Sequence, residues 1–183
     1  MKVSKPVKLF CIFIACSLGQ CKKKEIYFLP VPDTGEPPAV DIAIKNFTAE
    51  GYKDKALNWT LQSDTSYINY TNSEVVMKKI VMTYYESPGE SSLVTCDEAL
   101  MNRLTNDMSL KGEVRVKSSN GRQLYSDILY WDSKKEELST NVPVKIIYKD
   151  GEVITGRGLK ANGSLSKIVI YQPVGIHTIK DEK

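Results

Sequence analysis

Residues 110–131, LKGEVRVKSSNGRQLYSDILYW, decide the fold, because residues 140–161, TNVPVKIIYKDGEVITGRGLKA, repeat their pattern 30 positions later. The recurring residues are Val114, Val116, Gly121, Leu124 and Leu129, which return as Val144, Ile146, Gly151, Ile154 and Leu159. Short apolar alternations separated by glycine turns are typical of antiparallel strands. A repeat of this length that is built from strands predicts a stacked all-β architecture.

Three glycine turns separate the expected strands: Asn120-Gly121, Asp150-Gly151 and Asn162-Gly163. Asn-Gly and Asp-Gly favour type I′ hairpin turns, in which both central residues take positive φ. Pro143 has no backbone N–H, so we expect it at the start of a strand, where no ladder hydrogen bond is lost. These signals predict consecutive antiparallel hairpins.

Two further signals predict that the strands bend. Gly156 and Gly158 lie inside one strand pattern, where glycine indicates a bend or a close backbone approach. The apolar alternation also changes phase in the first copy, between Leu124 and the pair Leu129 and Trp131. A strand that changes face in mid-course predicts a sharply curved sheet.

Upstream of the repeat the chain continues as further strands. Trp59 and Leu61 alternate with polar residues, which is the period-two pattern of a half-buried strand. Leu93 lies 31 positions before Leu124, so we expect a weaker copy of the repeat in which Leu93 faces the same way. Residues 96–106 would allow a helical turn.

Charge and composition narrow the function classes. The first 20 residues contain three lysines and no acid, and the remainder carries 22 basic and 22 acidic residues. A neutral domain argues against nucleic-acid binding, which needs a basic face. The single histidine, His177, and Cys96, the one cysteine beyond the N-terminal segment, leave little material for a catalytic triad or a metal site. We therefore expect no enzyme activity, no cofactor and no metal.

The N-terminus reads as an export signal. Residues 1–20 combine a lysine-rich start with a ten-residue apolar run, which suits a signal peptide better than a membrane span. The segment Leu18-Gly19-Gln20-Cys21 resembles the lipobox of bacterial lipoproteins, although Gln20 departs from the small residue usual there. Cys21 is then the expected lipid attachment site, and Cys16 is a competing one. An uncleaved single-helix anchor and plain secretion are the alternatives, and each places the rest of the chain outside the cytoplasm.

The remaining boundaries follow from composition. Residues 21–40 contain four of the eight prolines in the chain, which predicts an extended linker. Residues 41–176 are the expected β domain, and residues 177–183 are a charged tail.

The serial motifs of the β domain resemble the LptC family of lipopolysaccharide export proteins over about residues 42–172. The motifs are Ala56-Leu57-x-Trp59-x-Leu61, Leu110-x-Gly112-x-Val114-x-Val116, Gly121-x-x-Leu124-x-Ser126-x-x-Leu129-x-Trp131, Val142-Pro143-Val144-x-Ile146 and Ile154-Thr155-Gly156-x-Gly158-Leu159. Gly158 matches the family's glycine before leucine. Lys55 stands where some members have glycine, with Gly51 four residues earlier.

This resemblance implies a twisted open β-jelly roll, a two-sheet β-sandwich of antiparallel strands with lipopolysaccharide acyl chains between its sheets. It implies a location on the periplasmic side of the inner membrane. It also implies partners: an inner-membrane ABC transporter, which hydrolyses the ATP, and a periplasmic LptA-like bridge protein. Residues 41–48 and 165–174 are the expected docking edges.

The apolar residues expected to face the lipid share inward positions in the predicted strands. They are Trp59, Leu61, Leu93, Val114, Val116, Leu124, Val144, Ile146, Ile154 and Leu159. The alternative is that each is an ordinary core residue. The rival function is a surface or periplasmic lipoprotein whose β-sandwich is a structural or adhesive interaction module.

Overall fold

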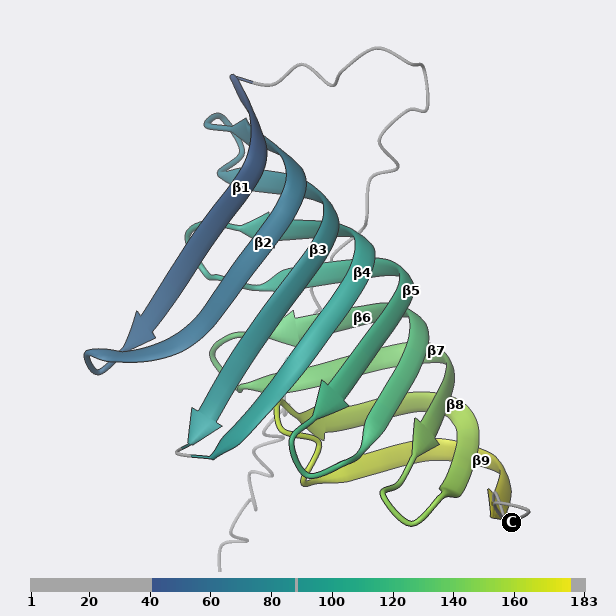
Figure 1. Cartoon of the computed structure of the whole chain (residues 1–183). Coiled ribbons are helices and arrows are strands. Elements are labelled where there is room, and N and C mark those ends of the chain that lie inside the picture. Colours follow the sequence, from purple (N-terminus) through teal and green to yellow (C-terminus); the bar gives the residue numbers. More distant parts are fainter. Residues whose placement is uncertain (1–40, 88, 179–183) are drawn as a thin grey trace, which may run out of the picture.

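Nine antiparallel strands pair strictly in chain order in the computed structural model, which describes residues 41–87 and 89–178 (Figure 1). The strands are β1 (Ile42–Lys53), β2 (Ala56–Asn69), β3 (Glu74–Ser87), β4 (Glu90–Asn102), β5 (Met108–Ser118), β6 (Gln123–Asp132), β7 (Glu137–Ile147), β8 (Glu152–Asn162) and β9 (Ile168–Thr178). The sheet does not close, so β1 and β9 are its two edges. The predicted signal segment and linker, and Cys21 with them, lie outside the described residues, as do residues 179–183 of the predicted tail, whereas residues 177 and 178 of that tail belong to β9.

The sheet folds back on itself because its strands bend near their middles (Figure 1). Register shifts interrupt the ladder between Lys111 and Val114 in β5, and between Ser126 and Tyr130 in β6. A shift of this kind bends a strand and increases its local twist. Strand β3 has no such register shift near its middle, but its residue Lys79 has a positive φ there. The predicted twisted open β-jelly roll is confirmed, with one refinement: its two layers belong to one continuous sheet.

Each copy of the 30-residue repeat corresponds to two adjacent strands of this sheet. Strands β5 and β6 form the first copy, and β7 and β8 form the second. The phase switch in β6 coincides with its register shift, and a second shift falls between Thr155 and Gly156 where β8 pairs with β9. The prediction of strongly bent strands is therefore confirmed.

Two local predictions are wrong. Gly121 and Gly151 have positive φ, but Asn120 and Asp150 do not, so the turns are not type I′. The amide of Gly121 instead donates to the carbonyl of Ser118 at 3.0 Å, as in a type I turn followed by a left-handed glycine. Pro143 lies within β7, at its register shift with β8, where the ladder is already interrupted. Residues 96–102 continue strand β4, and the expected helical turn follows at residues 102–106, where the amide of Asn106 donates to the carbonyl of Asn102 at 2.8 Å.

Candidate functional site

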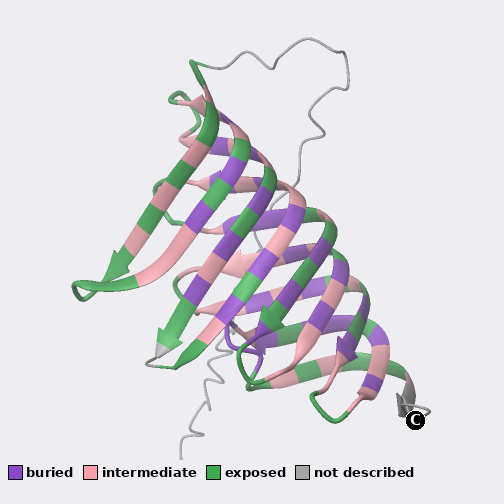
Figure 2. Cartoon of the chain, in the orientation of Figure 1, coloured by how far each residue is buried: buried purple, intermediate pink, exposed green. Residues whose placement is uncertain are grey.

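The layer that contains Leu61 and Ile146, here called the first layer, presents a continuous apolar row to the interior. Directly opposed residues on neighbouring strands make up this interior row: Ala49, Leu61, Met82, Val94, Val116, Leu124, Ile146 and Ile154. The row crosses eight consecutive strands, from β1 to β8. Buried and exposed residues alternate along most strands, as expected for a sheet with one covered face (Figure 2).

The second layer presents a matching row from its own half of the strands. Its opposed residues are Ile68, Val75, Met101, Met108, Trp131, Leu138, Ala161 and Ile168. The two layers meet where Tyr84 of β3 packs edge-on against Trp131 of β6, with ring centroids 4.9 Å apart. The interior is thus a two-sided apolar space that runs across the sheet.

Most residues predicted to face the lipid point into this interior. Leu61, Val114, Val116, Leu124, Val144, Ile146 and Leu159 are all buried in one core cluster. Trp59 is partly buried and packs against that cluster, and Ile154 lies opposite Ile146 in the interior row. Gly158, the glycine of the family motif, is buried in β8 with a φ of +76°.

Leu93 is the exception, because its side chain faces outward. It is 42% exposed, whereas its neighbour Val94 is buried and lies opposite Val116 in the interior row. The predicted offset of 31 residues is odd, and a slip of one residue moves a side chain to the other face of a strand. An offset of 30 from Leu124 leads to Val94, so the inward assignment of Leu93 was wrong.

The sequence reasoning missed the methionines of the interior. Met77, Met82, Met101 and Met108 are all buried in the core cluster. For Met77 and Met82, the apolar alternation of residues 74–86 changes phase at Lys79, where φ is positive, and this hides the pattern. Methionine is unbranched and adaptable, so these side chains can rearrange more easily than branched ones.

Between the two layers, close to the strand ends, the interior holds a cavity of about 20 Å³, lined by Met82, Tyr84, Val94, Met108, Leu110, Trp131, Leu138 and Gly163. This space is close to the minimum for a single water molecule. Side chains of the two layers therefore fill most of the interior around this cavity. An acyl chain could enter here only if the layers separated or these side chains moved.

The open side of the interior, here called the mouth, lies opposite the bend of the sheet. Turns of the two layers meet there. At one place Lys53 of β1 forms an ion pair with Glu136 of the β6–β7 turn. Both partners are exposed, so this pair contributes little stability. Further along, the carboxylate of Glu86 in β3 accepts hydrogen bonds from the amide of Ser164, at 2.7 Å, and from the side chain of Asn162, at 2.8 Å.

The electrostatics of Glu86 fit this bridging position. Partial burial of its carboxyl opposes ionisation, but the hydrogen bonds from Ser164 and Asn162 outweigh it and hold the pKa of Glu86 below its ordinary value. Glu86 is therefore charged at neutral pH and accepts both hydrogen bonds.

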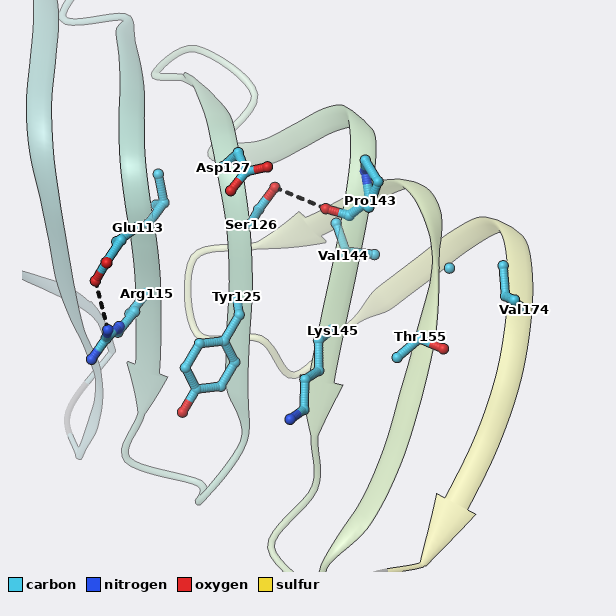
Figure 3. A pocket seen from close by; sticks show the side chains of 12 residues that line it. Glu113, Arg115, Tyr125, Ser126, Asp127, Pro143, Val144, Lys145, Thr155 and Val174 are labelled. Atoms are coloured by element: carbon cyan, nitrogen blue, oxygen red, sulfur yellow. Dashed lines mark hydrogen bonds and ion pairs between the residues drawn. The ribbon is translucent and has the colours of Figure 1, made fainter.

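The outer face of the sheet carries a shallow recess of about 500 Å³ over β5 to β9 (Figure 3). Arg115 is bound to Glu113 at 2.7 Å, and the Lys145 ammonium lies 6.0 Å from the centre of the Tyr125 ring. Asp127 adds a second carboxylate, so the charges of the recess balance. The recess lies on the face opposite the interior row.

Within the part of the chain that the structure describes, little supports a metal site, a reactive cysteine or a membrane-spanning helix. Residues 41–87 and 89–178 contain no group of three or more His, Cys, Asp and Glu side chains that could hold a metal ion. Burial raises the pKa of the Cys96 thiol to about 12, so this cysteine remains protonated and unreactive. Within the same residues, no helix is long and apolar enough to span a membrane.

Fold and interior together define an all-β protein of the jelly-roll type, with an apolar space between two layers of one open sheet. Comparison with known proteins gives the family: residues 9–178 match "LptC: Lipopolysaccharide-assembly, LptC-related". The chain therefore belongs to the LptC-related family, a component of lipopolysaccharide transport that is associated with the inner membrane on its periplasmic side. A similar relative, an uncharacterized protein of Aquifex aeolicus (strain VF5), is 27% identical over 154 residues, which cover 84% of this chain and 88% of that protein.

Proposed function

We propose that this chain accepts lipopolysaccharide from an inner-membrane ABC transporter and passes it to a periplasmic LptA-like bridge protein. The acyl chains travel between the two layers of the sheet, and Cys21 or an N-terminal helix anchors the chain. The observation that carries the proposal is the interior row, which crosses the sheet from β1 to β8 without a charged residue. An acyl chain needs such a path, because each buried CH₂ is worth about 0.8 kcal/mol and is costly to return to water.

The small size of the cavity between the layers sets a condition on this function. The layers have to open for each lipid, because the cavity of about 20 Å³ holds no acyl chain. Met82 and Met108 line that cavity and can move aside at low cost. Lipid is therefore expected to replace contacts between the layers rather than to fill an existing channel.

The edges of the sheet supply the docking surfaces of the proposal. No residue of β1 is buried, and the interior is therefore least covered at this end. At the other edge, β9 exposes Val169, Tyr171 and Val174. An unpaired edge strand with exposed apolar side chains can add a strand from a partner. We assign these two edges to the transporter and the bridge protein, without fixing which edge takes which partner.

Photo-crosslinking at two adjacent residues tests the lipid path. A diazirine analogue of leucine at position 159 faces the interior, whereas the same analogue at position 160 faces solvent, because Leu159 is buried and Lys160 is exposed. We expect lipopolysaccharide to be captured at position 159 while the transporter hydrolyses ATP, and not at position 160. Equal capture at both positions, or capture at 160 alone, would overturn the proposal.

Depletion of the protein separates this proposal from the rival, a structural or adhesive lipoprotein module. Loss of lipopolysaccharide from the cell surface is expected on depletion, with recovery when the wild-type chain is supplied. Unchanged export would favour the rival function.

A further inference from the structure

The β8–β9 turn, residues 163–167, places an apolar side chain inside the protein. Leu165 is fully buried in the core cluster, although it lies on a turn and has a φ of +55°. Positive φ is unfavourable for a leucine, so the surrounding contacts must hold this conformation. Gly163 of the same turn lines the cavity between the layers and leaves no room for a Cβ beside the ring of Tyr84. The turn thus closes the interior at the mouth.

The hydrogen bonds that hold the turn come from the opposite layer. The Ser118 hydroxyl donates to the carbonyl of Ser164 at 2.6 Å, and the Asn120 side chain donates to the same carbonyl at 2.9 Å. The Arg122 guanidinium donates to the carbonyls of Leu165 at 2.6 Å and Ser166 at 2.8 Å. These donors belong to the β5–β6 turn and its flanks, so the two turns are joined across the mouth.

Glu86 completes this set of contacts from β3, through its bonds to Ser164 and Asn162. All of these contacts join side chains of the first layer to the β8–β9 turn. None of them belongs to the ladder between β8 and β9, in which Ala161 remains opposed to Ile168. The turn can therefore detach from the first layer while its two strands stay paired.

We propose that the β8–β9 turn is a latch on the mouth of the interior, with Leu165 as its plug and Glu86 and Arg122 as its main holding residues. Acyl chains enter or leave the interior when the latch swings away from the β5–β6 turn. This inference rests on the proposed transport function and adds the element that controls access to the lipid path.

A matched pair of double variants tests the latch in the full-length chain that carries the photo-reactive residue at position 159. Glu86→Gln with Arg122→Ala removes holding contacts across the mouth. Glu113→Gln with Lys135→Ala removes two ion pairs that do not cross it, Glu113 with Arg115 and Lys135 with Asp132. With lipid A in detergent micelles as the probe, we expect the first variant to be labelled about tenfold faster than wild type, from the loss of charge-assisted hydrogen bonds. The control variant should match wild type.

A tether gives the opposite test and does not depend on weakening the protein. Arg122→Cys and Ser166→Cys, joined by a cleavable bifunctional thiol reagent, would fix the latch in place. The three N-terminal cysteines are replaced by serine, and buried Cys96 is left unchanged. Labelling at position 159 should stop on tethering and return on cleavage.

The outcomes separate the latch from the transport proposal. Labelling of wild type that neither the double variant nor the tether alters would overturn the latch and leave the transport function standing. Absence of labelling at position 159 in wild type and in the opened variant alike would overturn the transport function itself.

Discussion

The interior of this protein is lined by side chains that differ in how readily they rearrange. Met82 and Met108 line the cavity between the layers, whereas Val116 and Ile146 form a stiffer part of the interior row. A β-branched side chain is restricted at χ1, whereas methionine is unbranched and has three rotatable bonds. The adaptable residues thus lie where an entering acyl chain would need space.

Met82→Ile together with Met108→Ile tests this role of the methionines. The volume is nearly conserved, so we expect the free energy of unfolding to change by less than about 1.5 kcal/mol per site. Lipid capture at position 159 should nevertheless fall, because the new side chains cannot move aside. Val81→Ile on the exposed face is the control. Unchanged capture in the double variant would show that methionine flexibility has no role.

Gly156→Ala and Gly158→Ala should fail in different ways. A Cβ at Gly156 would lie 2.5 Å from Ile170 and 2.7 Å from the backbone carbonyl of Gln172, so we expect β9 to shift, at a cost of about 1–3 kcal/mol. At Gly158 the φ of +76° dominates, which costs an alanine about 1–2 kcal/mol while β9 stays paired. Hydrogen exchange of the β9 amides should rise in the first variant only, and equal exchange in both would contradict this.

Among the elements, the two edge strands are the ones left with free ladder groups. Strand β9 exposes apolar residues on its outer side. It packs closely against its neighbour β8 at Gly156. Such an edge is an aggregation hazard in an isolated protein and a docking surface in an assembly.

Val169→Lys with Tyr171→Lys should weaken docking at the β9 edge. Both side chains are exposed, so we expect the free energy of unfolding to change by less than about 0.5 kcal/mol per site. Binding of an LptA-like bridge protein or of the transporter, measured by pull-down from the full assembly, should fall. Val81→Lys, exposed at the middle of the sheet, is the control. Loss of binding in the control alone would place the docking surface elsewhere.

The positions of the strands were easier to predict from the sequence than the face of the sheet on which each side chain lies. The glycine turns and apolar alternations located the strands of the repeat. The change of phase in the apolar alternation of the first copy indicated that the strands bend. Leu93 was placed on the wrong face because a period-two pattern tolerates no slip of one residue. For residues 74–86 the sequence also did not show which side chains face the interior, because the positive φ at Lys79 reverses the apolar alternation within one strand. The latch could not be predicted at all, because its contacts join residues such as Glu86 and Ser164 that lie 78 positions apart.

At the scale of the whole molecule, one sheet supplies both walls of the interior. The bend of the sheet joins the walls on one side, whereas at the mouth side-chain contacts such as those of Lys53, Glu86 and Arg122 with the turns join them. Opening can therefore occur as a hinge about the fold, with no strand leaving the sheet. This differs from a sandwich of two separate sheets, in which no ladder of hydrogen bonds would hold the walls together.

Acid should weaken the mouth through Glu86. Because its pKa is lower in the folded state than the unfolded value of about 4.3, its stabilising contribution is complete above that value. The contribution is lost as the pH falls through the folded pKa. Thermal unfolding of wild type and Glu86→Gln should therefore differ at neutral pH and converge in strong acid. A difference that grew on acidification would contradict the assigned direction of the pKa shift.

The most direct measurement of the central claim follows lipid along the interior row. Diazirine residues would replace Leu61, Val116 and Ile146 in turn, with their outward neighbours Gln62, Lys117 and Lys145 as paired controls. All three inward positions should capture lipopolysaccharide during ATP hydrolysis by the transporter, and none of the outward ones should. Capture that is absent from the inward positions, or equal on both faces, would contradict a lipid path between the layers.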